Sequence, residues 1–387
     1  GGGRQHVGMA QKAAVDHGAV AQSDIEAILS EYFPCEVCAV RCATRLYGGF
    51  SAANYRVELT WGGGGAGAAA VGVDRPSAVL LKCCNDQPVD EAEEQATAVV
   101  YLADHGFSTT APYPLRCRAA VDRAGAGASA VNGDPGPAAA ASERGDHLVY
   151  TSTRLGPGRP SLVYTFLRGE NADTVCREGD AAACHSVLRS AGRTLGALHC
   201  VPPPPIGTVR HCMRSRGACM VGVQREQAAA MARSEHTADH AFTAFHREQL
   251  DVLEAAMATP GLPEAILHGD PFLDNMLADR AGRTLTGLID WEDVAVGPVI
   301  FDVACCVVGC CYDAGNRLDR GRLHALLEGY CTVRRLTPDE VRLFPTFCTV
   351  ALLCNATWRF TNFHIAHREV EHARDSYREL YDRIVDL

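Results

Sequence analysis

The sequence predicts an α+β protein of two lobes: a small, mainly antiparallel sheet lobe over residues 23–167 and a mostly helical lobe over residues 168–387. Three observations favour this class. Short strand-forming runs separated by Gly-containing turns surround one long helix in the first lobe. Apolar residues recur with helical spacing after Arg168-Gly169. The length, 387 residues, is sufficient for a two-lobed unit with a sizeable core.

The first lobe is expected to begin with a helix. Ser23 followed by Glu26 fits a capping box, and a helical apolar stripe follows at Ile25, Ile28, Leu29 and Tyr32. The next predicted elements are two strands within 41–60 around Gly48-Gly49, a strand over 78–82, a helix over 91–105 that ends at Gly106, and strands over 147–153 and 161–167. Residues 61–77 and 119–146 are interpreted as long loops, and residues 1–22 as a flexible leader.

The second lobe is expected to be helical. Helices are predicted over 183–200 and 237–257, and the segment 320–387 should be largely helical. The apolar run 303–312 is too short to cross a bilayer, which needs about 20 residues. We therefore expect no transmembrane helix.

The amino-acid composition limits the classes of function that the protein can have. A net charge of −10 argues against a nucleic-acid partner. Only two of the 36 basic residues, Lys12 and Lys82, are lysines, so a lysine that persists in this arginine-rich chain is a candidate for a specific role. The 18 cysteines in so long a chain are expected to be mostly reduced and buried. Cys35 and Cys38 form a CxxC pair, which keeps a thiol-redox or metal-binding protein open as an alternative.

One constellation carries the strongest chemical signal. An apolar segment leads into His268-Gly269-Asp270, Asn275 follows five residues after Asp270, and Asp290 ends a second apolar strand. Each piece alone occurs as an ordinary turn. Together, in this order, they match what phosphoryl transfer from ATP requires: a carboxylate at the acceptor hydroxyl, an amide oxygen and a carboxylate for Mg²⁺, and a lysine for the phosphates.

The roles follow from this chemistry. Asp270 is predicted to be the base, with His268 in the catalytic group beside it, and Asn275 and Asp290 are predicted to be the metal ligands. Lys82, at the end of a strand, is predicted to anchor the α- and β-phosphates. Its carboxylate partner is expected on the next helix, at Glu94, with Glu91 and Glu93 as alternatives. The Gly48-Gly49-Phe50-Ser51 turn would cover the nucleotide phosphates with backbone N–H groups.

These motifs resemble a known family. His268-Gly269-Asp270 with Asn275, Ile289-Asp290-Trp291, Gly297-Pro298 and Phe301-Asp302-Val303-Ala304 are similar to the aminoglycoside phosphotransferase and choline kinase group. The resemblance covers nearly the whole chain and implies a protein-kinase-like fold. Further runs are most similar to the bacterial-type homoserine kinase branch: 48–57, Thr165-Phe166-Leu167-Arg168-Gly169, Gly196-Ala197-Leu198-His199, Leu327-Glu328-Gly329-Tyr330 and 334–340.

The resemblance has consequences for single residues. It places Thr165 and Leu167 beside the nucleotide, and it implies that Asp302 begins a helix and braces the catalytic loop. The branch often has Ala where this chain has Gly269 and a basic residue where it has Leu273.

The acceptor is expected to be a small molecule. Asp302 follows Asp290 by only 12 positions, too few for the activation segment that a protein substrate requires. For an amino-acid acceptor, Asp274, Glu292 and Asp293 are candidates for the ammonium, and Arg359 for the carboxylate unless it pairs with a helix neighbour. Trp291 or Trp358 could instead stack on a quaternary ammonium.

The sequence therefore favours a cytoplasmic, ATP- and Mg²⁺-dependent kinase of an amine-bearing metabolite, with homoserine first. An organellar matrix is the alternative location if the leader is a trimmed transit segment. Choline, ethanolamine, hydroxylysine and aminoglycosides remain alternative acceptors. A nucleotide-binding pseudokinase is the competing class, although every expected catalytic position is filled. No membrane or nucleic-acid partner is expected.

Overall fold

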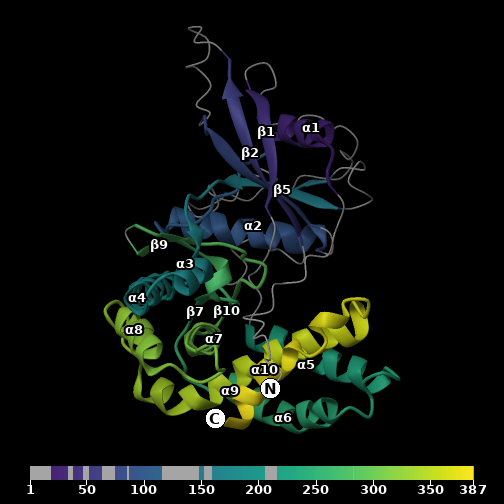
Figure 1. Ribbon diagram of the computed structural model, residues 1–387, viewed down its shortest axis with the longest axis vertical. Helices are drawn as coiled ribbons and strands as arrows, with labels where there is room; N and C mark the ends of the chain where they lie inside the picture. Colours follow the sequence, from purple (N-terminus) through teal and green to yellow (C-terminus); the bar gives the residue numbers. More distant parts are fainter. Residues whose placement is uncertain are drawn as a thin grey trace, which may run out of the picture. The chain divides into compact units, whose positions relative to one another are not determined.

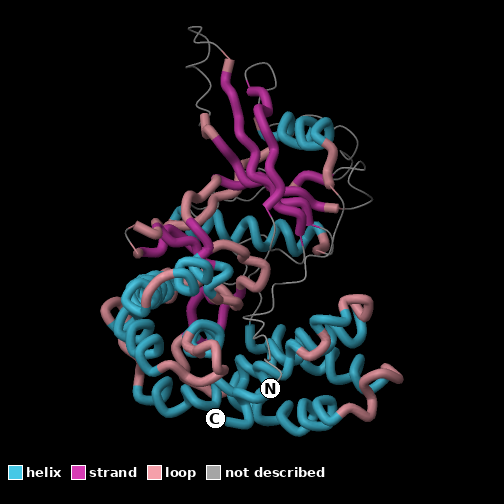
Figure 2. The backbone as a smooth tube through the Cα atoms, viewed as in Figure 1, coloured by secondary structure: helices cyan, strands magenta, loops and turns pink. Residues whose placement is uncertain are grey.

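The computed structural model describes residues 19–33, 38–46, 52–62, 75–84, 87–115, 148–151, 159–204, 216–281 and 283–386. The chain divides into two compact units, one containing Ala14–Phe166 and the other Leu167–Pro203 and Met213–Leu387. Strands dominate the described part of the first unit and helices that of the second (Figures 1 and 2). This distribution confirms the predicted α+β class.

The first unit contains a five-stranded antiparallel sheet with the order β1-β2-β3-β5-β4. Its elements are α1 (Gln22–Tyr32), β1 (Cys38–Leu46), β2 (Ala52–Trp61), β3 (Ala78–Cys84), α2 (Val89–Asp104), β4 (Tyr150–Thr151) and β5 (Pro160–Thr165). Neighbouring strands pair in sequence order except for β5, which inserts beside β3 and leaves β4 at the edge. The Gly48-Gly49 turn expected between β1 and β2 lies outside the described residues.

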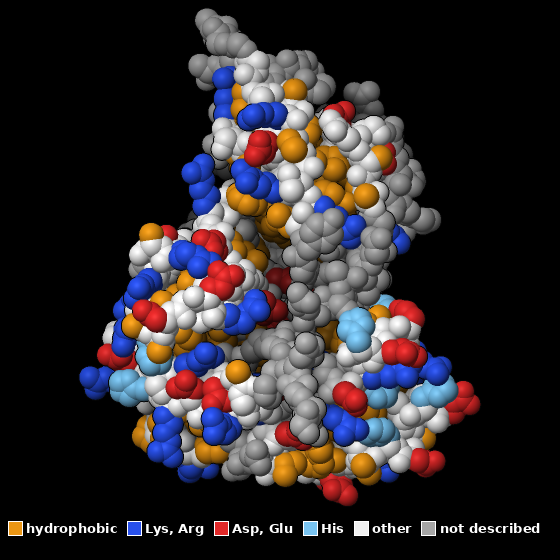
Figure 3. All heavy atoms as spheres, viewed as in Figure 1, with side chains coloured by type: hydrophobic (Ala, Val, Ile, Leu, Met, Phe, Trp, Pro, Cys, Tyr) orange, Lys and Arg blue, Asp and Glu red, His pale blue; other side chains and the backbone are white. Residues whose placement is uncertain are grey.

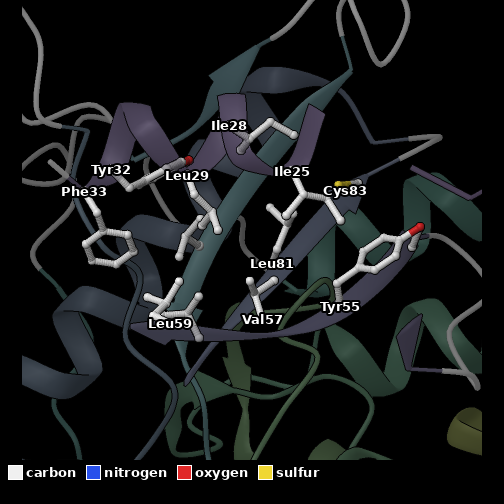
Figure 4. Close-up of a cluster of buried hydrophobic side chains, with 13 residues drawn as sticks. Ile25, Ile28, Leu29, Tyr32, Phe33, Tyr55, Val57, Leu59, Leu81 and Cys83 are labelled. Carbon is white, nitrogen blue, oxygen red and sulfur yellow. The ribbon is translucent and has the colours of Figure 1, made fainter. Parts of the chain in front are cut away.

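Helix α1 covers one face of this sheet (Figure 4). The stripe predicted from the sequence, Ile25, Ile28, Leu29 and Tyr32, is fully buried. It packs against the alternate positions of β2 and β3, among them Tyr55, Val57, Leu59, Leu81 and Cys83. Each large apolar side chain buried in this way stabilises the fold by about 1.5–3 kcal/mol. The period-2 pattern of the strands therefore selects which residues meet the helix.

The start of α1 corrects one prediction. The N-cap is Ala21, which makes no side-chain cap, and Ser23 lies inside the first turn. Gln22 at the first helical position instead donates to Glu26 one turn later, at 3.0 Å. The capping-box assignment is wrong because the serine is displaced by two positions from the residue whose backbone is extended.

The second unit combines helices with two small sheets, ordered β10-β7 and β6-β8-β9. Its elements are β6 (Glu170–Asn171), α3 (Ala172–Glu178), α4 (Ala181–Leu198), α5 (Arg216–Arg233), α6 (Ala241–Met257), β7 (Glu264–Leu267), β8 (Met276–Asp279), β9 (Thr284–Leu288), β10 (Ala295–Pro298), α7 (Val299–Cys310), α8 (Arg320–Cys331), α9 (Pro338–Thr361) and α10 (Ser376–Asp386). Helix α5 was not predicted from the sequence.

Helix α7 is the central element of the second unit. All twelve of its residues are buried, and an all-round apolar helix is stable only inside a core. It packs against α9 and contacts α4 and α8. Residues 303–310 of the apolar run noted at 303–312 belong to this core helix. No helix in the described part of the chain is long and apolar enough to cross a membrane. Fourteen of the cysteines within the described ranges are free thiols, and ten of these fourteen are buried.

Candidate active site

Asp270 and Asn275 lie together after strand β7. Asn275 ends a short 3-10 turn, Leu273–Asn275, and its Nδ2 donates to the Asp270 backbone oxygen at 2.9 Å and to Asp270 Oδ2 at 2.8 Å. Both acceptors lack a proton, so the amide nitrogen must face them and Oδ1 must face away. Asn275 therefore orients the Asp270 carboxylate and keeps its own oxygen on the opposite side, where it could coordinate a metal.

Asp290 is held next to Asn275 by a β-ladder. Met276 pairs with Leu288 across β8 and β9, and the Ile289 N–H donates to the Asn275 backbone oxygen at 3.0 Å. The two residues thus flank the same end of one hairpin. Asp290 adopts a positive φ of 65°, a left-handed conformation that costs a non-glycine residue roughly 1–3 kcal/mol and is frequent at functional sites. An amide oxygen and a carboxylate are hard ligands, so this donor set fits Mg²⁺.

Asp302 braces the loop that precedes Asp270. It lies on the first turn of α7 and is fully buried. Its carboxylate accepts the backbone N–H of His268 at 2.6 Å and of Gly269 at 2.9 Å. Burial raises the pKa of Asp302, but the hydrogen bonds from His199 and the His268 backbone outweigh it, so the net pKa lies below its ordinary value. An ionised Asp302 anchors the loop, as the resemblance implied.

His268 is a positioning residue and not a proton-transfer group. Its Nε2 contacts the Ile289 carbonyl oxygen at 3.0 Å, its Nδ1 accepts the Asp270 backbone N–H at 3.4 Å, and its ring packs against Trp291 at 4.6 Å. Complete burial lowers its pKa, so the ring is neutral at pH 7. Both ring nitrogens are engaged by the backbone. The prediction that His268 belongs to the catalytic group is corrected for this reason.

The candidates for the acceptor ammonium lie around the same loop. Asp274 is half-buried, and its backbone oxygen accepts Asn171 Nδ2 at 2.9 Å. Glu292 is half-buried and Asp293 is exposed, in the turn after Asp290. Asn171 was missed in the sequence, although an Asn before the helical run Ala172–Glu178 is an N-cap signal, and it caps α3 through the Asp173 N–H at 3.0 Å.

Two residues expected at the acceptor have other roles. Trp291 is 1% exposed and packs on His268, so it offers no face to a quaternary ammonium. Arg359 donates through one nitrogen to Glu379 and to the Ser376 carbonyl oxygen, both at 3.0 Å. It pairs with a helix neighbour, the alternative that the sequence left open. Trp358, on the preceding position of α9, is 41% exposed.

Lys82 occupies a distinct environment in the first unit. It lies in β3, pairs in register with Asn54 and Leu162, and is 5% exposed. Strand alternation places it on the same face as Leu80 and Cys84, which pack against helix α2. Helix α2 also carries Glu91, Glu93 and Glu94, and Glu93 accepts the Val149 backbone N–H at 3.2 Å. A buried ammonium requires a carboxylate partner, and α2 provides three.

The remaining predicted nucleotide residues are divided between the units. Thr165 ends β5, and its hydroxyl accepts the Ala111 backbone N–H at 2.9 Å. Leu167 begins the second unit and packs on Gly287 of β9, where an added Cβ would lie 2.6 Å from its side chain. Gly48, Gly49, Phe50 and Ser51 lie outside the described residues.

The fold, with a carboxylate–amide–carboxylate set at the end of one hairpin, points to the phosphotransferase class. The chain belongs to the phosphotransferase enzyme family, which matches residues 43–344. Two curated relatives are homoserine kinases. That of Beijerinckia indica is 30% identical over 53% of this chain and 59% of its own length. That of Pseudomonas aeruginosa is 31% identical over 52% of this chain and 57% of its own length. The match spans less than two thirds of these relatives.

Solved structures are similar over nearly the whole chain. Amicoumacin kinase in complex with AMP-PNP, Ca²⁺ and Ami has a TM-score of 0.59 at 14% identity, covering 94% of each chain. A choline/ethanolamine kinase family protein from Mesorhizobium loti has a TM-score of 0.53 at 16% identity, covering 98% of this chain and 94% of its own. At these identities the likeness establishes the fold, which confirms the protein-kinase-like class.

Proposed function

We propose that this protein transfers the γ-phosphate of ATP to the hydroxyl of a small amine-bearing metabolite, with homoserine as the favoured acceptor. The observation that carries the proposal is the contact of Asn275 with Asp270, next to Asp290 at the end of the same hairpin. The homoserine kinases at about 30% identity support the choice of acceptor.

The proposed roles follow from the geometry of each unit. Asp270, oriented by Asn275, positions the acceptor hydroxyl and takes its proton. Asn275 Oδ1 and Asp290 would hold Mg²⁺, which when bound neutralises charge on the phosphates. Lys82, with Glu94 as its proposed partner on α2, anchors the α- and β-phosphates. Because phosphoryl transfer involves little covalent chemistry by the protein, this positioning accounts for most of the catalysis.

We place the acceptor ammonium at Asp274, with Glu292 as a second ligand. Asp274 directly precedes Asn275, so an amine bound there would leave the acceptor hydroxyl near Asp270. The charge of Asp274 also contributes to a raised pKa at Asp173, whose main cause is burial.

The first test is Asp270→Asn. The substitution keeps the side-chain shape and can keep the hydrogen bond to Asn275, but it removes the proton acceptor. We expect turnover to fall by a factor on the order of 10³, with the dissociation constant for ATP changed by no more than about twofold. Unchanged turnover would contradict the proposed role of Asp270.

The acceptor is tested separately. ADP release is measured with homoserine, choline, ethanolamine, hydroxylysine, methylthioribose and an aminoglycoside at matched concentrations. Homoserine should give the highest kcat/KM, and Asp274→Asn should raise its KM without a matching effect on ATP. Equal activity on a neutral alcohol would contradict an ammonium site. No activity on any acceptor would favour the pseudokinase alternative.

A further inference from the structure

Two sequence motifs that the catalytic roles leave unexplained meet in the second unit. Gly196-Ala197-Leu198-His199 ends α4, and Leu327-Glu328-Gly329-Tyr330 lies in α8. The two helices lie side by side (Figure 1). A Cβ at Gly192 would lie 2.0 Å from the Leu326 carbonyl oxygen, and one at Gly329 would lie 2.0 Å from the Arg189 carbonyl oxygen. The glycines allow the backbones to approach closely enough for His199 to reach Tyr330.

His199 connects Tyr330 of α8 to Asp302, the residue that anchors the catalytic loop. Its Nε2 lies 3.4 Å from Asp302 Oδ2, and its Nδ1 lies 2.9 Å from the Tyr330 hydroxyl. The rings of His199 and Tyr330 pack edge to face at 5.7 Å. His199 is 6% exposed, Tyr330 1% and Asp302 0%. The contact between these side chains is therefore shielded from water, where hydrogen-bond geometry has its largest effect.

The chain of contacts continues to the start of α9. Arg334 donates to the Tyr330 hydroxyl at 3.2 Å and to Glu340 Oε1 at 2.9 Å. Glu340 is fully buried, and its Oε2 accepts the Thr337 backbone N–H at 2.7 Å. The Thr337 hydroxyl accepts the Glu340 N–H in return, which completes a capping box. Glu340 is thus fixed to the backbone of its own helix.

The donors and acceptors fix the direction of each hydrogen bond in this series of contacts. Arginine can only donate, so the Tyr330 oxygen accepts from Arg334 and its own hydrogen must point to His199 Nδ1. An imidazole that accepts at Nδ1 carries its proton on Nε2, and Nε2 faces Asp302. A proton on Nδ1 would leave the phenolic hydrogen without an acceptor in a buried site, at a cost in free energy.

We infer that Glu340, Arg334, Tyr330 and His199 form a positioning relay that fixes the proton of His199 on Nε2 and thereby holds Asp302 in the orientation that anchors the catalytic loop. The inference rests on the proposed function, because the loop matters for turnover only if Asp270 acts on the acceptor. None of the four residues touches a reacting atom. They act through Asp302, which binds the backbone of His268 and Gly269.

The relay is tested by histidine ¹⁵N NMR and by steady-state kinetics on the full chain. In the parent protein, the proton of His199 should lie on Nε2, and Nδ1 should carry none. Its signals are assigned with His199→Asn. Tyr330→Phe removes only the hydroxyl. It should redistribute the His199 proton and lower kcat roughly tenfold, with KM for ATP changed by less than about twofold.

Tyr377→Phe is the matched control. Tyr377 is also buried in the second unit, and its hydroxyl faces a histidine, His240, at 3.5 Å. This pair has no contact with Asp302 among the hydrogen bonds of the described residues. Loss of this hydroxyl should leave both the His199 signals and kcat unchanged.

The possible results of these experiments distinguish a failure of the relay from a failure of the proposed function. A protonated Nδ1 on His199 in the parent chain, or a kcat loss in Tyr330→Phe no larger than in Tyr377→Phe, would overturn the relay. The parent spectrum decides the tautomer even if Tyr330→Phe does not fold. If the parent protein phosphorylates no acceptor, the proposed function fails, and the NMR result still decides whether the relay exists.

Discussion

Gly269 shows how one residue constrains the catalytic loop. Its φ is +87°, and an added Cβ would lie 2.3 Å from the Asp293 carbonyl oxygen, a backbone atom that cannot rotate away. The loop therefore approaches the Asp293 turn more closely than an alanine would allow. The single hydrogen in place of a methyl group lets the backbone beside Asp270 pack against the segment after Asp290.

Gly269→Ala should therefore destabilise the chain and impair turnover. Gly261→Ala is the matched control, because Gly261 has a similar φ of +78° but nothing within 4 Å of an added Cβ. The free energy of unfolding of the control should fall by about 1–2 kcal/mol, which is the cost of a left-handed backbone conformation for an L-residue. Gly269→Ala should lose more, measured by urea unfolding, and its kcat should fall. Equal losses in the two variants would show that the contact with Asp293 is unimportant.

Lys82 is the residue where lysine and arginine should differ most. A guanidinium keeps the charge but is planar and larger, whereas the β3 site is 5% exposed and suits a compact ammonium. We expect Lys82→Arg to lower kcat/KM for ATP by a factor on the order of 100, and Lys82→Met to have a similar effect. The free energy of unfolding, measured in parallel, separates misfolding from the loss of a phosphate ligand. Full activity in Lys82→Arg would contradict the anchor role.

At the scale of elements, the C-terminal helix α10 is held by a buried ion network. Glu379 binds Arg359 of α9 at 3.0 Å and Arg383 one turn along α10 at 2.5 Å. Arg383 also donates to the Val308 carbonyl oxygen in α7 and lies over the Tyr312 ring at 4.2 Å. This arrangement explains why Arg359 is not available to a substrate carboxylate: its guanidinium already neutralises a partly buried glutamate.

The pair α5 and α6 introduces a pH dependence of stability. His246 of α6 is fully buried, its Nε2 contacts Gln224 of α5 at 2.9 Å, and burial lowers its pKa to about 4. Unfolded histidine has a pKa near 6.5. Below that pH the unfolded chain binds a proton that the folded chain excludes, so the free energy of unfolding falls as pH is lowered.

Lowering the pH from 7 to 5 should cost about 2 kcal/mol through His246 alone. The side chain in His246→Gln does not titrate and can still form a hydrogen bond to Gln224. The variant should therefore lose this part of the dependence of the free energy of unfolding on pH, measured by urea unfolding between pH 7 and pH 5. His324 provides the control, because its side chain is 80% exposed, and His324→Gln should leave the slope as it is. An unchanged slope in His246→Gln would contradict this origin.

At the scale of the whole molecule, the charge is dispersed. Basic and acidic side chains alternate over the face of the helical unit shown in Figure 3. Several form exposed ion pairs, such as Arg189 with Glu328 and Arg280 with Glu170. Such pairs each contribute little to stability. The net charge of −10 therefore concerns solubility and the choice of partner more than the fold.

Local patterns predicted most of the elements but not all. Strand alternation and the α1 stripe identified the core of the first unit because burial of one face imposes a period on the residues. Helix α5 was missed because few of its residues are apolar, and most of its length is polar or alanine. The Ser23 cap was wrong because the start of a helix depends on a backbone conformation that several nearby residues could adopt.

The sequence by itself determined which chemical groups the proposed reaction would use. Phosphoryl transfer is indicated by the order and spacing of Asp270, Asn275 and Asp290, together with one lysine in a strand. That reaction needs this set of groups, and few other reactions need it. Only the tertiary structure decided how the groups are held. Its contacts show that Trp291 and Arg359 are not available to bind the acceptor. They also show that His199 contacts both Asp302 and Tyr330. Those assignments depend on contacts between residues far apart in the chain, which no local pattern records.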